Sequence, residues 1–95
     1  MATYSIHCVD KPDSLPLRMA TREAHLAYIA ANRAIVKLAG PMIDAQGQMA
    51  GSIFVVDVED LAAAQAVNTN DPYQRAGLFG HVHVTAWKVT VGELP

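Results

Sequence analysis

The stretch SIFVVDVEDLAAAQAV, which spans residues 52–67, contains a strand signal and a helix signal side by side. Residues 52–58 are apolar enough for a central β-strand whose neighbours cover both of its faces. Glu59 and Asp60 can then cap a helix over residues 61–67, because acidic groups suit the positive end of a helix dipole. We therefore expect a buried strand that leads directly into a helix in the middle of the chain.

The segment before this stretch predicts a strand, a helix and a second strand. Residues 3–9 alternate between apolar and polar side chains, which is typical of a strand with one buried face. Residues 17–31 are rich in Ala, Leu and Arg and predict a helix. Residues 35–39 resume an extended conformation, and the turn signal Gly40-Pro41 should end this strand. The helix should face the sheet with a stripe made of Ala20, Ala24, Ala27, Tyr28 and Ala31.

The last strand is expected over residues 80–89, with Val82, Val84 and Ala86 on one face. The complete order of elements is then βαββαβ. Such an α+β chain forms a four-stranded antiparallel sheet with both helices on one side. No repeat, linker or second hydrophobic unit is visible, so residues 1–95 should form a single domain.

Composition and charge narrow the range of partners. Hydrophobic residues make up 52% of the chain and charged residues 17%, and the formal net charge is −2. The seven Lys and Arg are scattered singly, so no basic stripe is available for nucleic-acid phosphates and no nucleic-acid partner is expected. Cys8 is the single cysteine and cannot form an internal disulfide. Because a leader-like segment and an apolar run of roughly 18 residues are both missing, we expect a cytoplasmic protein without a membrane partner.

The sheet face opposite the helices predicts self-association. Two helices can cover only one face of the sheet, and the other face still carries large apolar side chains. A second copy of the chain is the simplest cover, so we expect a homodimer or a higher homo-oligomer. The apolar side chains assigned to this face are Val9, Val55 or Ile53, Trp87 and Val89.

Three residues could carry chemistry. Arg22 and His25 lie three positions apart on the first helix and therefore share one side of it. If the Asp71 carboxylate lies beside the imidazole, it fixes the tautomer and leaves the other ring nitrogen free to move a proton. A purely structural explanation is also open: His25 could be a partly buried polar residue, and Asp71 before Pro72 could simply cap a short helix.

Three further histidines could form a metal cluster. His7, His81 and His83 fall on the less apolar sides of the first and last strands, which are neighbours in this fold. Their spacing matches no strong ligand pattern, and histidines on strands commonly pack or form hydrogen bonds. We therefore expect neither a metal nor an organic cofactor.

Five short motifs, taken in order, resemble the YciI-like family over nearly the whole chain. The resemblance implies a ferredoxin-like fold related to the dimeric α+β barrels, with a pocket and a catalytic histidine–aspartate pair. The matching positions are His25 and Asp71, with Arg22, Gly40 and Pro41 as substrate-binding residues. The motifs are DKPDS at residues 10–14, REAHL at 22–26, AGPM at 39–42, DPY at 71–73 and GHV at 80–82.

The combined prediction is a small-molecule enzyme that transfers protons on a small cyclic or enol substrate, in a lyase- or isomerase-type reaction. His25 would act as general base or acid, Asp71 would orient it, and Arg22 would bind an anionic or enolate oxygen. The alternative is a non-catalytic dimeric domain that binds a metabolite or supports another enzyme. Whether the chain is an enzyme at all stays open at this point, because one fold hosts many functions.

Overall fold

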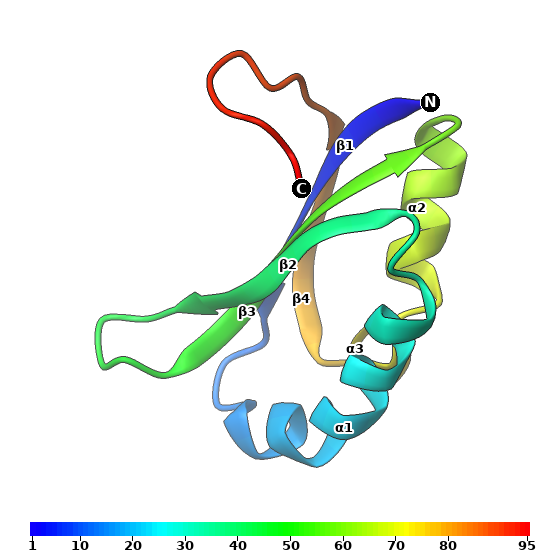
Figure 1. Cartoon of the computed structure of the whole chain (residues 1–95). Coiled ribbons are helices and arrows are strands. Elements are labelled where there is room, and N and C mark those ends of the chain that lie inside the picture. Colours follow the sequence, from blue (N-terminus) through cyan, green and yellow to red (C-terminus); the bar gives the residue numbers. More distant parts are fainter.

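A computed structural model describes residues 1–95 and contains one four-stranded antiparallel sheet with its helices on one side (Figure 1). The expected α+β architecture is confirmed, and the short helix that Asp71 could cap is present before the last strand. The elements are β1 (Ala2–Asp10), α1 (Leu15–Ala31), β2 (Val36–Ile43), β3 (Met49–Val58), α2 (Leu61–Thr69), α3 (Pro72–Arg75) and β4 (Phe79–Ala86).

The strands lie in the order β2-β3-β1-β4, so β1 and β3 occupy the centre of the sheet. Their side chains alternate, and those on the helix side are completely buried, as in Ile6 and Cys8 of β1 and Phe54 and Val56 of β3. Helix α2 packs on this face with Ala64 and contributes to the same apolar core. Burial of a large aliphatic or aromatic side chain contributes about 1.5–3 kcal/mol, so this layer supplies much of the fold's stability.

Helix α1 corrects one expectation, because its inward face is not the alanine stripe. The buried residues of α1 are Arg18 and His25, and Tyr28 is half-buried. These polar side chains can be buried because each has a hydrogen-bond partner on another element. The alanines point outward instead, as Ala20, Ala24, Ala27 and Ala31 are all exposed.

Strand β2 corrects a second expectation, because Gly40-Pro41 does not end it. The strand continues to Ile43, and Pro41 lies opposite Ser52 in the ladder with β3. Proline is tolerated there because β2 is an edge strand, so the missing N–H need not bond to a neighbour. The Gly-Pro pair is therefore part of the sheet surface.

Strand β4 is shorter than expected and ends at Ala86. Trp87 still donates its N–H to the Thr3 carbonyl at 3.0 Å. Beyond that bond the ladder stops, because Tyr4 pairs with Ala86 and β1 begins only two residues earlier. Trp87 and Val89 therefore belong to a tail that lies on the side of the sheet away from the helices (Figure 1).

The sheet face opposite the helices, called the outer sheet face below, retains apolar side chains in contact with solvent. Val9 is 42% exposed, Leu38 49% and Ile53 38%. They come from three adjacent strands and form one patch, because Val9 pairs with Gly51, Gly40 pairs with Ile53 and Leu38 pairs with Val55. Val55, expected to be uncovered, is already buried in the single chain. None of the helices is both long and apolar enough to cross a membrane.

Candidate active site

A cavity of about 260 Å³ lies between helix α1 and strands β2 and β3. The predicted site residues Arg22, His25, Gly40 and Pro41 line it, whereas Asp71 lies behind His25 and does not. Its other lining residues are Arg18, Leu26, Ile29, Ala39, Met49, Ser52 and Tyr73. On the helix side the lining residues recur every three or four positions, so one face of α1 forms a complete wall.

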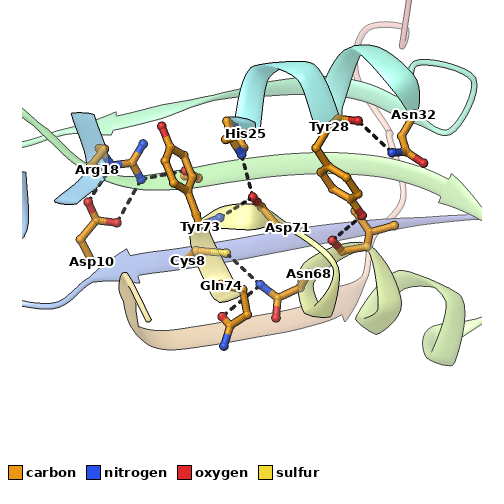
Figure 2. Close-up of polar contacts among 12 residues, drawn as sticks. Cys8, Asp10, Arg18, His25, Tyr28, Asn32, Asn68, Asp71, Tyr73 and Gln74 are labelled. Atoms are coloured by element: carbon orange, nitrogen blue, oxygen red, sulfur yellow. Dashed lines mark hydrogen bonds and ion pairs between the residues drawn. The ribbon is translucent and has the colours of Figure 1, made fainter. Parts of the chain in front are cut away.

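His25 and Asp71, which are 46 positions apart in the sequence, meet in this structure (Figure 2). His25 Nδ1 lies 2.8 Å from Asp71 Oδ1, and Asp71 is fully buried. The same Oδ1 accepts a hydrogen bond from the Tyr73 backbone N–H at 2.9 Å and so caps α3. Asp71 therefore both caps a short helix and contacts the His25 imidazole, the two placements that the sequence analysis considered.

This contact determines which nitrogen of His25 can react. An ionised carboxylate only accepts hydrogen bonds, so Nδ1 must carry the donated proton. Nε2 has no hydrogen-bond partner within the chain. The one side-chain oxygen or nitrogen that is both enclosed and without a partner is Asp71 Oδ2, so Nε2 is not enclosed. Nε2 thus opens into the cavity that His25 lines. The imidazole is also held by stacking on the Tyr73 ring, with centroids 4.0 Å apart.

Arg18 is the residue that the sequence analysis missed. The Arg18 side chain is 2% exposed and forms a bidentate ion pair with Asp10, with Nε–Oδ2 at 2.7 Å and Nη2–Oδ1 at 3.0 Å. Nη2 also donates to Ser52 Oγ at 2.9 Å, and the guanidinium lies 4.5 Å from the centre of the Tyr73 ring. Burial opposes the charge, but the Asp10 carboxylate outweighs it and holds the pKa of Arg18 above its ordinary value. A signal was present in the sequence, since Arg18 lies seven positions before His25 and thus on the same helix face.

Arg22 differs from Arg18 in its surroundings. It is exposed at the rim of the cavity and takes part in no ion pair, since the two in the structure are Arg18–Asp10 and His25–Asp71. The charge of Arg18, deeper in the site, has the Asp10 carboxylate as its partner, whereas the charge of Arg22 has none. The cavity mouth therefore favours an anionic ligand.

Cys8 lies in the core and is not suited to nucleophilic chemistry. Its thiol is fully buried, and burial together with the nearby Asp71 charge raises its pKa to about 12. The thiolate, which is the reactive form, is therefore scarce at neutral pH. Asn68 Nδ2 lies 3.7 Å from the sulfur and fixes it in place.

The three strand histidines lie away from the cavity. His7 and His83 are cross-strand partners on the outer sheet face, and His81 lies opposite Val9. All three are exposed. The structure brings together no group of three or more His, Cys, Asp or Glu side chains that could hold a metal ion.

The chain is similar in sequence to a known protein family and to individual proteins of that family. A family model described as the YCII-related domain matches residues 2–88. Protein YciI of Escherichia coli O6:H1 is 39% identical over 93 residues, covering 90% of this chain and 95% of the relative. An uncharacterized protein of Haemophilus influenzae is 34% identical over 93 residues, with the same two coverages.

Among solved structures, 5-chloro-2-hydroxyhydroquinone dehydrochlorinase (TftG) from Burkholderia phenoliruptrix AC1100 is similar throughout. Its complex with 2,5-dihydroxybenzoquinone matches with a TM-score of 0.85 and 32% identity, over 90% of this chain and 93% of that chain. A putative antibiotic biosynthesis monooxygenase from Nitrosomonas europaea matches with a TM-score of 0.54 and 12% identity, over 96% and 100% of the two chains. At that identity the second match shows a shared fold alone.

Proposed function

Because the chain belongs to the YCII-related family, we propose that it is a small-molecule enzyme that transfers protons on a small oxygen-bearing ring or enol substrate. One observation carries this proposal above the others. His25 Nδ1 is tied at 2.8 Å to a buried carboxylate, while Nε2 opens into a cavity. This is the arrangement that a general base and acid requires.

The proposed reaction begins with His25. Nε2 accepts a proton from a ring hydroxyl or from a carbon next to a carbonyl, and the electron pair of the broken bond stays on the substrate as an enolate. Asp71 stabilises the resulting imidazolium without taking its proton. Arg22 binds the enolate oxygen. In an isomerase the proton returns to another substrate atom; in a lyase the enolate electrons expel an anionic leaving group, and the proton passes to water.

The cavity supports a small substrate. Its volume of about 260 Å³ lies below the range of about 300–1,000 Å³ typical of pockets for drug-sized ligands, so a single substituted ring suits it best. Gly40 and Pro41 supply one wall from the edge strand β2. The similarity to a dehydrochlorinase solved with 2,5-dihydroxybenzoquinone favours hydroxylated rings over other small molecules.

The proposal also includes assembly and location. We place a second copy of the chain against the outer sheet face, since Val9, Leu38 and Ile53 leave an apolar patch there. A cytoplasmic location suits the buried free thiol of Cys8, which has no disulfide partner.

A substrate panel tests the function. The purified protein is incubated with 5-chloro-2-hydroxyhydroquinone and other chlorinated hydroquinones, and chloride release is followed with an ion-selective electrode. Ring-hydrogen exchange of unchlorinated enols and quinones is followed by NMR in D₂O. We expect at least one member to react faster than in buffer, with the Gln65→Ala variant, at an exposed position of α2 outside the cavity, equally active. Tight binding without any turnover across the panel would instead indicate a metabolite-binding domain.

A further inference from the structure

Building on the proposed function, we infer that Arg18, Ser52 and Tyr73 form an inner oxygen-binding site in the buried part of the cavity. The substrate then carries oxygen at two separate positions of its ring. The inner site holds one, and the other faces His25 and Arg22. Arg18 thereby becomes a specificity-determining residue.

The hydrogen bonds of Arg18 leave one nitrogen unused. Of its five N–H groups, those that bond within the chain are on Nε and Nη2, to Asp10 and Ser52. Nη1 takes part in none of these bonds and is not an enclosed atom without a partner. Because Arg18 lines the cavity, this leaves Nη1 available to a ligand there, beside the Tyr73 hydroxyl. A nearly buried guanidinium that keeps a free donor edge toward a cavity is suited to receive a ligand oxygen.

Ser52 and Tyr73 add donors beside that edge. Ser52 Oγ accepts from Arg18 at 2.9 Å, and no acceptor within the chain takes its own hydroxyl proton. The Tyr73 hydroxyl lies beside the Arg18 guanidinium in Figure 2, close enough to accept a hydrogen bond from it, and no acceptor within the chain takes the hydroxyl's own proton. Burial, the largest effect, raises the pKa of Tyr73, so the hydroxyl keeps its proton at neutral pH and can donate. Arg18, Ser52 and Tyr73 therefore converge with protons that no acceptor within the chain takes, which favours an anionic or carbonyl oxygen as the ligand.

The Arg18 guanidinium is held in place before a ligand binds, and the Tyr73 ring separates it from His25. Asp10 grips the guanidinium through two atoms, so little reorganisation is needed when a ligand binds. The Tyr73 ring lies between the Arg18 guanidinium, 4.5 Å from its centre, and the His25 imidazole, 4.0 Å away (Figure 2). A ligand that reaches both groups must be about as wide as an aromatic ring, which selects rings with oxygens on opposite edges.

Two coloured ligands test this inference by equilibrium dialysis. 2,5-Dihydroxybenzoquinone as a dianion presents a charged oxygen pair on two opposite edges, whereas 2-hydroxy-1,4-benzoquinone presents one such edge. We expect the wild type to prefer the first by about tenfold or more, the usual effect of one charge-assisted hydrogen-bonded contact. Arg18→Lys and Ser52→Ala should each reduce this preference severalfold, whereas Arg75→Lys, at an exposed position that does not line the cavity, should leave it unchanged.

Failure of the inference can be told apart from failure of the proposed function. If Arg18→Lys does not fold, Ser52→Ala and Tyr73→Phe still test the binding preference, because each removes a single donor atom. Unchanged preference in these variants, or no binding of either quinone by the wild type, overturns the inner site. Turnover is measured separately with the substrate panel, so an active enzyme with unchanged preference would refute the inner site alone. If the variants lose the preference for 2,5-dihydroxybenzoquinone and the wild type turns over no substrate, the inner oxygen-binding site is supported and the proposed enzymatic function is refuted.

Discussion

Asp71 shows how one side chain can serve structure and chemistry together. Its Oδ1 is shared by the Tyr73 N–H and the His25 imidazole, and its Oδ2 is buried without a hydrogen-bond partner. A buried carboxylate with an unsatisfied oxygen is costly. Such a cost is typical of a position kept for its effect on a neighbour, here the orientation of His25.

Asp71→Asn should therefore damage turnover more than folding. The amide can present an N–H to His25 Nδ1, which places the imidazole proton on Nε2 and removes the base from the cavity. We expect kcat/KM to fall by at least about a hundredfold, by analogy with other histidine–carboxylate pairs. Steady-state kinetics checks this, with Asp13→Asn, at an exposed position outside the cavity, as the matched control. A loss of less than threefold would argue against the pair.

Cys8 should be inert in the folded protein. With a pKa of about 12 instead of 9.0, its thiol is protonated at pH 8 and is also shielded by the core. Iodoacetamide should leave it unmodified until urea unfolds the chain, as mass spectrometry would show. The raised pKa also means that the unfolded state loses its proton first, so stability should fall as pH rises from about 9 toward 12. Rapid labelling of the native protein would contradict this.

At the scale of elements, the sequence predicts the order of strands and helices but not the orientation of α1. Alternation identified β1, a nearly continuous apolar run identified β3, and the acidic pair before Leu61 identified the start of α2. The alanine stripe misled because alanine favours a helix on any face, whereas Arg18 and His25 can be buried only through partners on distant segments. Local patterns carry no information about such partners.

The start of α2 offers a test of local stability. The Asp60 side chain accepts a hydrogen bond from the Ala63 N–H at 2.9 Å, whereas the neighbouring Glu59 makes no such bond. Asp60→Ala should lower the free energy of unfolding by about 0.5–2 kcal/mol, the usual cost of losing an N-cap. Glu59→Ala is the control and should cost less. Urea denaturation measures both, and equal effects would show that the cap contributes little.

At the scale of the whole molecule, the outer sheet face is the surface on which we propose that two copies of the chain associate. Ile53 is the better probe, because Val55 is buried in the single chain and its replacement would disturb the fold itself. Ile53→Asp should convert a dimer into a monomer, since it would place an unpaired charge in a dry interface. Light scattering measures the molar mass of this variant and of the control Val91→Asp, which adds the same charge at a 92% exposed tail position and should leave the dimer intact. A dimer that survives Ile53→Asp would mean that another face associates.

The central proposal drawn from the geometry of the site is that the open nitrogen of His25 moves protons on the substrate. Exchange of the ring hydrogens of 2,5-dihydroxybenzoquinone for deuterium, followed by NMR, reports that movement directly, because each exchange requires a proton to be delivered and removed. The wild type should accelerate exchange, His25→Ala should be as slow as buffer although its circular dichroism is unchanged, and added imidazole should restore part of the rate. Exchange by a folded His25→Ala variant at the wild-type rate, or no acceleration by the wild type, would contradict the account.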